Sequence, residues 1–307
     1  MHVTLRQLAA FEAVARHLSF TRAAAELHLT QPAVSMQIKQ LEQATGLPLF
    51  EQLGKRIYLT EAGRELYQYS RNIQQQLQEL ESVLEDLKGV RRGRLSLAVA
   101  STANYFAPRL LAAFSKRYEA VAFSLDVTNR EALLRHLEAN DQDLVIMGRP
   151  PEELDVEAAP FMENPLVVIA PPDHPLAGRR RIPLARLESE SFVLRESGSG
   201  TRIAMERFFA ERGIRLSTGM ELSSNEGIKQ SVEAGLGLGI VSRHTLETYL
   251  DARRLVELDV EGFPILRHWY VVHRRGKRLS PVAQAFKTFM LEEAAALLRK
   301  DPLFNAA

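Results

Sequence analysis

Cysteine is absent from this sequence of 307 residues. Its absence excludes disulfides, cysteine-ligated zinc and iron–sulfur sites, and thiol nucleophiles. Neither sign of charge predominates, because 39 lysine and arginine residues and 38 aspartate and glutamate residues give a net charge of +1. The total charge therefore gives no general attraction for nucleic acids or other polyanions, and any site for them must be local.

Long hydrophobic runs are missing as well. The longest weakly polar stretches, LSLAVASTANYFAP and GLGLGIVS, are shorter than the ~18 to 20 apolar residues that cross a bilayer. The amphipathic N-terminal segment contains Arg6, Glu12 and Arg16, where a secretory signal needs an uninterrupted apolar stretch. We therefore expect a cytoplasmic protein without a membrane partner.

Common catalytic motifs are not found either. The sequence contains no GxSxG, GxxxxGK(S/T) or HExxH pattern. His268 and His273 are five positions apart on an expected strand, so their side chains face opposite sides and cannot share a metal ion. We therefore predict that the protein is not an enzyme and has no catalytic residue, no metal site and no cofactor.

The length of the sequence predicts about two domains, at roughly 150 residues each. Its first part has helical periodicity, with apolar residues at three- and four-residue steps. Thr30 is a good N-cap and Pro32 suits a first helical turn, so a third helix is predicted to begin at about Gln31. The apolar face of the first helix consists of Leu5, Leu8, Phe11, Ala15 and Leu18.

The third helix has two contrasting sides. At 100° per residue, Ile38 and Leu41 lie within about 40° of Val34 and form an apolar stripe. A solvated surface is one interpretation of the other side, and the recognition surface of a helix-turn-helix in a DNA groove is the second. That other side carries small or hydrogen-bonding groups, one cation and no carboxylate: Pro32, Ser35, Met36, Lys39, Gln40 and Gln43.

The segment that follows favours the second interpretation. The sequence LFEQLGKRIYLT alternates around Gly54, Lys55 and Arg56, which predicts a small hairpin with two cations at its tip. Cations in that position suit contacts with DNA phosphates.

A heptad pattern follows over residues 60–88. The apolar steps alternate between four and three residues, and a helix of this length would extend about 40 Å. We predict self-association along this seam, while packing on its own chain is the alternative. The seam consists of Leu66, Ser70, Ile73, Leu77, Leu80, Leu84 and Leu87, and the segment GVRRGR after it is expected to be a hinge.

Strands alternate with helices after Arg94, which predicts partly parallel α/β sheets. The strands LSLAVA, AFSLDVT and DLVIMG enclose helices over 108–118 and 130–138, and the strands SFVLRE, TGMELS and LGIVS enclose helices over 201–212 and 225–234. The chain is expected to cross between these two lobes near 164–165 and near 264. The segment RHWYVVHRR then returns as a strand, and a helix over 280–299 closes the first lobe.

The two lobes repeat their polar clusters at an offset of 96 residues. Each cluster lies between the end of a strand and the start of a helix, where open α/β sheets bind ligands and helix N–H groups favour a carboxylate or phosphate. Simple helix capping is the alternative. Ser101–Thr102 corresponds to Ser197–Gly198, and Thr128–Asn129 corresponds to Ser224–Asn225.

The segment LRQLAAFEAVARHLSFTRAAAELHLTQPAVSMQIKQLEQATGLPLFEQLGKRIYLTEAG resembles the winged helix-turn-helix of LysR-type transcriptional regulators. Residues 2–300 are similar to that family throughout. The resemblance implies an all-α winged helix-turn-helix, a long linker helix, and an α/β effector module of two Rossmann-like subdomains like those of periplasmic binding proteins. The implied boundaries are 1–59 for the DNA-binding domain, 60–89 for the linker and dimerisation helix, 90–94 for the hinge, 95–163 with 267–300 for subdomain I, and 164–266 for subdomain II.

The resemblance also implies site residues. Many family members have arginine where this chain has Met36, which offers only apolar contact, for example with a thymine methyl group. DNA contacts are implied for Gln31, Pro32, Ser35, Met36 and Lys39, with Lys55 and Arg56 in the wing. Effector contacts are implied for Ser101, Thr102, Thr128, Asn129, Ser197, Gly198, Gly200, Thr201, Arg202 and Asn225, and dimer contacts for Leu66, Ile73, Leu77, Leu80, Leu84 and Leu87.

Within the family, ASTANYFAPRLLAAF and the cluster from Ser197 to Thr201 resemble regulators of Calvin-cycle (RuBisCO) operons. Those regulators respond to phosphorylated or otherwise anionic metabolites and nucleotides. The implied partners are double-stranded promoter DNA, such an effector, further copies of the chain in a dimer or tetramer, and RNA polymerase. Effector binding is expected to change the oligomer geometry and the bending of DNA. The alternative is a small-molecule binding protein or enzyme whose N-terminal helices serve only assembly.

Overall fold

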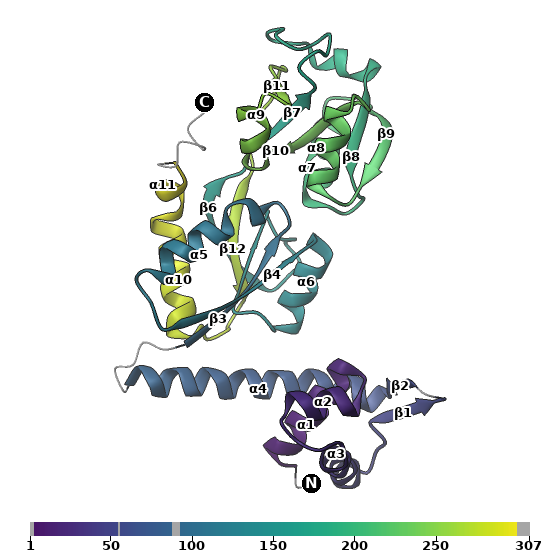
Figure 1. Ribbon diagram of the computed structural model, residues 1–307, viewed down its shortest axis with the longest axis vertical. Coiled ribbons are helices and arrows are strands. Elements are labelled where there is room, and N and C mark those ends of the chain that lie inside the picture. Colours follow the sequence, from purple (N-terminus) through teal and green to yellow (C-terminus); the bar gives the residue numbers. More distant parts are fainter. Residues whose placement is uncertain (1–2, 55, 88–92, 300–307) are drawn as a thin grey trace. The chain divides into compact units, whose positions relative to one another are not determined.

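The computed structural model describes residues 3–54, 56–87 and 93–299. The chain forms two compact units, residues 1–84 and residues 85–307 (Figure 1). Lys55 and hinge residues 90–92 lie outside the described residues, as does the side chain of Leu87. The predicted limits of the linker and the hinge stay predictions.

The first unit begins with three helices: α1 (Leu5–His17), α2 (Phe20–Glu26) and α3 (Gln31–Thr45). Each begins at a side-chain cap, because Thr4, Ser19 and Thr30 accept a hydrogen bond from the N–H group three residues later. Pro32 occupies the first turn of α3, where no helical N–H partner is lost. The predicted start of the third helix is therefore confirmed.

The core of this unit joins α1 to α3. Phe11 and Val14 pack with Val34, Ile38 and Leu41, and all five side chains are buried. The predicted inner stripe of α3 is thus confirmed. The predicted apolar face of α1 is wrong at both ends, since Leu5 is 53% exposed and Leu18 is 46% exposed. Leu18 has a φ of 45° and lies beyond the last helical residue, so its side chain leaves the helical stripe.

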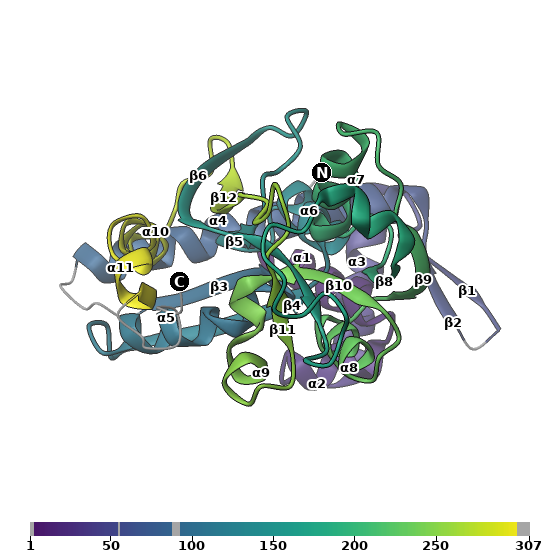
Figure 2. The ribbon, with the colours of Figure 1, turned by 90° about the horizontal axis from the view of Figure 1, so that it is seen from above.

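A two-stranded wing follows α3. Strands β1 (Phe50–Leu53) and β2 (Arg56–Leu59) pair antiparallel, as predicted, and project from the three helices in both ribbon views (Figures 1 and 2). The long helix α4 (Glu61–Leu87) begins close behind them. A Cβ atom at Gly63 would lie 2.1 Å from the Leu49 carbonyl oxygen, so this approach requires glycine.

The second unit contains two α/β lobes. The sheet of the first lobe has the order β4-β3-β5-β12-β6, in which β3, β4 and β5 are parallel and β12 is antiparallel to β5 and β6. Its strands are β3 (Gly93–Ala100), β4 (Val121–Thr128), β5 (Leu144–Met147), β6 (Val156–Glu163) and β12 (His268–Arg274). Its helices are η1 (Ala103–Tyr105), α5 (Ala107–Ser115), α6 (Arg130–Ala139), α10 (Pro281–Glu292) and α11 (Ala294–Arg299).

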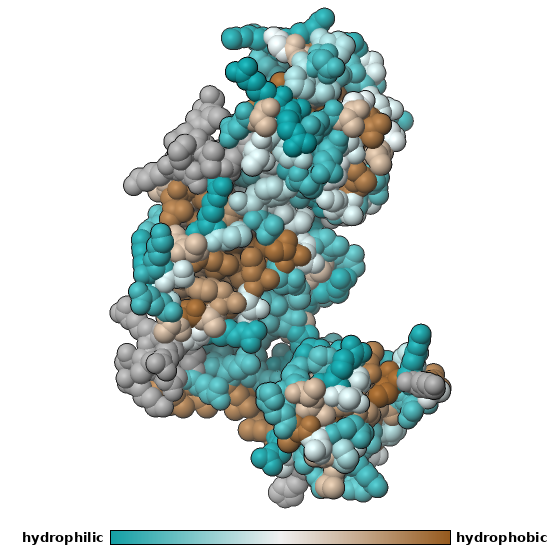
Figure 3. Space-filling model, viewed as in Figure 1, coloured by the Kyte–Doolittle hydropathy of each residue, from teal (hydrophilic) through white to brown (hydrophobic). Residues whose placement is uncertain are grey.

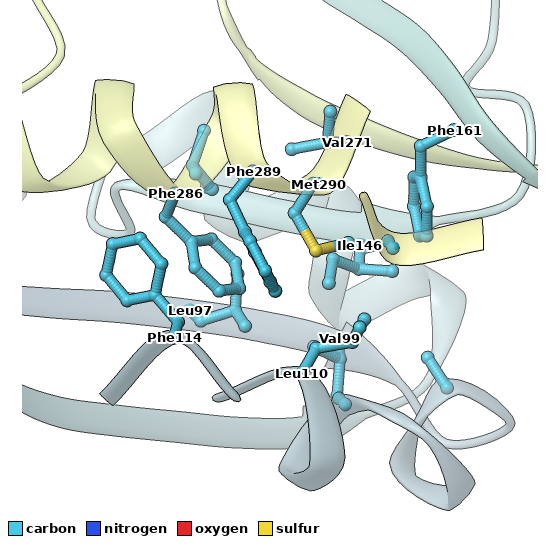
Figure 4. Close-up of a cluster of buried hydrophobic side chains, with 14 of the residues drawn as sticks. Leu97, Val99, Leu110, Phe114, Ile146, Phe161, Val271, Phe286, Phe289 and Met290 are labelled. Carbon is cyan, nitrogen blue, oxygen red and sulfur yellow. The ribbon is translucent and has the colours of Figure 1, made fainter. Parts of the chain in front are cut away.

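Both faces of this first sheet are covered. Leu97 and Val99 of β3 point into a core with α5, α10 and α11, where Phe114, Phe286 and Phe289 pack together (Figure 4). Ala98, between those two residues, belongs to the core under α6 on the opposite face. The closing helix predicted over 280–299 is two helices instead, because the helical hydrogen bonding breaks at Glu293.

The sheet of the second lobe has the order β11-β7-β10-β8-β9, with β8 parallel to β9 and β10. Phe192 and Leu194 face α7, while Val193 faces α8. Its strands are β7 (Leu166–Ala170), β8 (Ser191–Arg195), β9 (Ser217–Leu222), β10 (Leu238–Ser242) and β11 (Val256–Leu258). Its helices are η2 (Leu184–Ser189), α7 (Gly200–Ala210), α8 (Asn225–Glu233), η3 (Arg243–Thr245) and α9 (Glu247–Asp251).

The chain crosses between the lobes at two adjacent places. The Asn164 N–H donates to the Arg267 carbonyl at 2.7 Å, and the Leu166 and Ile265 backbones exchange two hydrogen bonds. The predicted crossings and the returning strand are therefore confirmed, and α5 to α8 each begin within one residue of the predicted start. In the part of the chain that the structure describes, no helix has the length and apolar composition to span a membrane.

Candidate nucleic-acid interface and ligand cavity

Within the first unit, the outer face of α3 is accessible to a partner molecule. Gln31, Pro32 and Lys39 are exposed, and Met36 is 59% exposed. Ser35 is half-buried, and its Oγ accepts a hydrogen bond from Gln31 Nε2 at 2.9 Å. The structure therefore brings all five predicted contact residues of α3 to one accessible surface.

This surface carries no carboxylate because the one acidic side chain of α3 is used elsewhere. Glu42 Oε1 accepts the backbone N–H of Leu49 at 2.8 Å and that of Phe50 at 3.4 Å. Glu42 thereby fixes the turn into the wing, and Gly46, with a φ of 72°, ends the helix. The cation Lys39 is left without an acidic neighbour on the outer face of α3.

The tip of the wing lies between Gly54, with a φ of 64°, and Arg56. Arg56 is exposed, as predicted for a phosphate contact. Lys55, the other predicted wing residue, lies outside the described residues.

Helix α4 exposes part of its apolar seam. Leu80 is 52% exposed and Leu84 is 47% exposed, while Leu66, Ile73 and Leu77 are half-buried. Figure 3 shows hydrophobic side chains gathered along one edge of α4. An exposed leucine stripe of this kind is typical of a helix that pairs with another copy.

The second unit contains a cavity of about 280 Å³ between its lobes. Its wall combines the end of β3, the first turns of α6 and α7, and the crossing segment before β12. Six of the predicted effector residues line it: Ser101, Thr102, Thr128, Asn129, Gly200 and Thr201.

The other predicted effector residues lie outside the wall. Ser197 and Gly198 are exposed loop residues, and Arg202 forms an ion pair with Glu206. Asn225 is buried behind the wall, where it accepts a hydrogen bond from Arg195 Nη1 at 2.7 Å and donates to Ser101 Oγ at 3.4 Å. It can therefore position two wall residues without reaching the cavity.

Helix capping occurs at residues that also line the cavity, and the predicted effector contacts stay predictions. Asn129 caps α6, since its Oδ1 accepts the Ala132 N–H at 2.9 Å, and it also lines the cavity. Ser199, which sequence reasoning missed, does the same for α7 by accepting the Arg202 N–H at 3.0 Å.

Sequence reasoning also missed the positive charge of the cavity. Five arginines and His268 line it, and no aspartate or glutamate is found among its described wall residues. Burial lowers the pKa of Arg130, and burial followed by the charge of Arg130 lowers the pKa of Arg267 to about 10. Both guanidinium groups are still cationic at neutral pH, so the cavity suits an anion. The five arginines are Arg130, Arg149, Arg195, Arg207 and Arg267.

A polar cluster joins the two lobes beside this cavity. The Tyr105 hydroxyl of the first lobe donates to Glu226 at 2.9 Å and accepts from Lys229 Nζ at 3.1 Å, and both partners belong to α8. Lys229 is fully buried, pairs with Glu226 at 2.8 Å and donates to the Thr245 carbonyl at 2.8 Å. Burial lowers the pKa of Lys229, and the ion pair with Glu226 opposes this change.

The described residues contain no cluster of three or more histidine and acidic side chains that could hold a metal ion.

Two family models match the chain. Residues 5–64 match "Bacterial regulatory helix-turn-helix protein, lysR family", and residues 88–295 match "LysR substrate binding domain". The second match covers the whole region that contains the cavity.

Individual relatives agree with these matches. The RuBisCO operon transcriptional regulator of Allochromatium vinosum is 64% identical over 297 residues, which cover 97% of this chain and 98% of that protein. The structure of the Synechocystis PCC6803 CcmR regulatory domain in complex with 2-PG is 45% identical with a TM-score of 0.63, and covers 65% of this chain and 96% of that chain. The structure of full-length CbnR complexed with its target DNA is 22% identical with a TM-score of 0.68, covers 95% of this chain and 100% of that chain, and shows a common fold.

Proposed function

Since this chain belongs to the LysR family of transcriptional regulators, we propose that it binds the promoter of a carbon-fixation operon and responds there to a small anionic metabolite. The Allochromatium vinosum relative supports the choice of operon, because its similarity extends over both the DNA-binding unit and the effector unit. This proposal is one of regulation and not of catalysis.

The cavity supports the choice of effector. It presents five arginines and no described carboxylate, and the hydroxyl groups of Ser101, Thr102 and Thr201 add hydrogen-bond donors. A cavity of about 280 Å³ lies at the lower end of the range for small-molecule sites, which is roughly 300 to 1,000 Å³. The 2-phosphoglycolate (2-PG) bound to the CcmR regulatory domain is a ligand of this size and charge, and we propose it for this chain.

The DNA surface in this proposal consists of α3 and the wing. Exposed groups with donor or apolar character suit base edges, and the cations suit phosphates. The proposed contacts are Gln31, Pro32, Ser35, Met36 and Lys39, together with Lys55 and Arg56. Pairing of α4 with a second copy would present two such surfaces to half-sites separated by whole turns of DNA, at about 10 base pairs each. We include RNA polymerase as a partner of the DNA-bound assembly.

Fluorescence anisotropy with the full-length protein tests this function. The probes are a labelled fragment of the RuBisCO-operon promoter from the source organism and a shuffled fragment of equal length. We expect the promoter fragment to bind about a thousandfold more tightly than the shuffled one, and both affinities to fall steeply with salt because phosphate contacts release counterions. Equal affinities for the two fragments would exclude a specific regulator of this operon.

The same measurement distinguishes the proposed regulator from the alternative function. A small-molecule binding protein or enzyme that uses its N-terminal helices only for assembly would bind 2-phosphoglycolate but show no salt-dependent preference for promoter DNA. Ser101→Ala and Thr201→Val should weaken effector binding and leave DNA affinity unchanged. If both variants unfold instead, these side chains serve the fold and not the ligand.

A further inference from the structure

One tyrosine of the first lobe contacts a group of polar side chains in the second lobe. The Tyr105 hydroxyl donates to Glu226 Oε2 at 2.9 Å and accepts from Lys229 Nζ at 3.1 Å. Tyr105 belongs to η1 of the first lobe, whereas Glu226 and Lys229 belong to α8 of the second. These two hydrogen bonds therefore join the lobes directly. We call this group, together with Tyr249 of α9, the interlobe cluster; it consists of Tyr105, Glu226, Lys229 and Tyr249.

The part of the cluster that lies in the second lobe is held in place by contacts within that lobe. Lys229 is fully buried, and its Nζ pairs with Glu226 and donates to the Thr245 carbonyl, each at 2.8 Å. The ammonium group lies 4.5 Å from the centre of the Tyr249 ring and 4.6 Å from that of Tyr105, where cation–π attraction acts. The Tyr249 hydroxyl donates to the other carboxylate oxygen of Glu226. The second lobe therefore presents a fixed donor and a fixed acceptor to Tyr105.

The interlobe cluster lies outside the cavity wall but close to it along the chain. Tyr105 is three residues after Thr102, which lines the cavity. Glu226 follows Asn225, which donates to the wall residue Ser101 at 3.4 Å. One short segment of each lobe thus carries part of the cluster and contacts the wall. A change in the cluster can therefore move wall residues without removing any of them.

The cavity contains charges that oppose this position of the lobes. Arg130 and Arg149 come from the first lobe, and Arg195 and Arg207 from the second. Like charges repel, so the two walls favour separation whenever no anion is bound between them. Hydrogen bonds to charged partners are roughly twice as strong as those between neutral groups. The contacts of Tyr105 with a carboxylate and an ammonium group are of this strong kind and oppose the separation.

We propose that Tyr105 is a positioning residue, whose hydrogen bonds to Glu226 and Lys229 hold the two lobes together when no effector is bound. An anion in the cavity favours the same position, because it neutralises arginines of both walls. The effector and the interlobe cluster then act in the same direction. The role of the effector rests on the proposed function, whereas the lobe position without effector can be measured independently of it.

Pulsed electron paramagnetic resonance measures the distance between the lobes. Because the chain has no cysteine, two substitutions give one spin label in each lobe. Ala120→Cys in the first lobe and Ala210→Cys in the second are at exposed positions. Full-length labelled chains are diluted into an excess of unlabelled chains, so that most assemblies contain one labelled chain and the distance within that chain is observed.

Tyr105→Phe is the test variant, because it removes the hydroxyl group and keeps the ring over Lys229. Tyr249→Phe is the matched control, since it removes a hydroxyl group from the same carboxylate entirely within the second lobe. Without effector, we expect the fraction of chains with separated lobes to rise about tenfold in Tyr105→Phe and to stay at the wild-type value in Tyr249→Phe. Saturating 2-phosphoglycolate should return Tyr105→Phe to the wild-type distance.

The outcomes distinguish the positioning role from the proposed function. A distance distribution that is unchanged in Tyr105→Phe overturns the proposal, and so does an equal change in Tyr249→Phe, because the cause would then lie within the second lobe. If Tyr105→Phe separates the lobes and 2-phosphoglycolate does not bring them together, the positioning role stands and the proposed effector is wrong.

Thermal unfolding supplies a second measurement. Each variant loses one hydroxyl group of the same cluster, so we expect both unfolding midpoints to fall by similar small amounts. A similar loss of stability with a changed distance in Tyr105→Phe alone supports the interlobe contact. A midpoint of Tyr105→Phe far below that of Tyr249→Phe, with the wild-type distance retained, would assign Tyr105 to the stability of the fold instead.

Discussion

Glu42 illustrates how a single residue shapes the surface of α3 that we propose to bind DNA. Its carboxylate accepts two backbone N–H groups at the entrance to the wing, so the only acidic group of the helix does not oppose DNA phosphates. The single cation Lys39 and the half-buried Ser35 then differ in what they can contribute. An ammonium group contacts phosphate without regard to sequence, whereas a hydroxyl group at a base edge reads sequence.

We expect Lys39→Ala to weaken binding to promoter and shuffled DNA alike and to reduce the salt slope by about one. Ser35→Ala should cost about 1 kcal/mol, chiefly at one base pair of the operator. Anisotropy titrations over a salt series with single-base operator variants measure both effects. Lys116→Ala removes an exposed lysine of the second unit and serves as the control. Unchanged promoter affinity in both α3 variants would show that this helix does not contact DNA.

Glu26 gives the first unit a pH dependence. Hydrogen bonds from Arg16 at 2.5 Å and from His17 at 2.6 Å hold the pKa of Glu26 at about 2, below its usual 4.5. A lowered folded-state pKa stabilises the fold above pH ~4.5, and this stabilisation is lost as the pH falls toward 2. Because the side chains of Arg16 and Glu26 are 43% and 41% exposed, the effect amounts to about 1 kcal/mol or less.

We therefore expect the wild type to lose more stability than Glu26→Gln between pH 5 and pH 2.5, by about 1 kcal/mol or less. Denaturant unfolding of the full chain, followed through the transition of the first unit, measures this difference. Parallel pH profiles for the two proteins would show that the Arg16 contact does not stabilise the fold.

At the scale of elements, pairing of helix α4 with a second copy would bury its exposed leucines. We expect Leu80→Glu and Leu84→Glu each to weaken self-association by about tenfold or more, since each places a charge in an apolar seam. Sedimentation over a concentration series measures the dissociation constant. Gln78→Glu introduces the same charge on the opposite side of the helix and should leave it unchanged. Lowered stability with unchanged association would favour packing of α4 on its own chain.

Lys229 of helix α8 connects this helix to the turn η1 through a hydrogen bond to Tyr105. Replacing this buried lysine by methionine leaves the Tyr105 hydroxyl and the Thr245 carbonyl without their donor. We expect Lys229→Met and Glu226→Gln each to destabilise the second unit by about 3 kcal/mol, because the first leaves two polar groups without their donor and the second leaves a buried ammonium group without its counter-charge. Urea unfolding gives both values. A similar small loss for both variants would mean that the cluster adds little to stability.

The sequence predicted elements better than it predicted the cavity wall. Helical periodicity and the caps at Thr30 and Asn129 are local, so α3 and α6 begin where they were expected. The proposed role of Arg130 and Arg267 depends instead on the fold, which brings both side chains to a cavity wall whose described residues include no carboxylate. Neither property has a local sequence pattern, and arginines 137 positions apart give no motif. For the same reason Ser197 and Gly198 matched the repeat but lie outside the wall.

At the scale of the whole molecule, the cavity suits regulation because its wall belongs to both lobes. Ser101 and Arg130 come from one lobe and Gly200 and Thr201 from the other, while the two crossings lie side by side at Asn164 and Arg267. An anion held by both walls stabilises one relative position of the lobes. It shifts the equilibrium between two lobe positions only to the extent that its affinities for the two positions differ.

This coupling should be visible on DNA. We expect 2-phosphoglycolate to change the length or the hypersensitive bands of the promoter footprint of the wild type, because a changed effector unit alters the spacing of the two DNA-binding units. Arg267→Gln should keep the effector-free footprint and lose the change, since its DNA surface is intact while its anion site is weakened. Nuclease footprints at saturating protein, with and without effector, measure this. Identical wild-type footprints at an effector concentration that saturates binding would separate effector binding from DNA geometry, and the regulator would then have to act through another step.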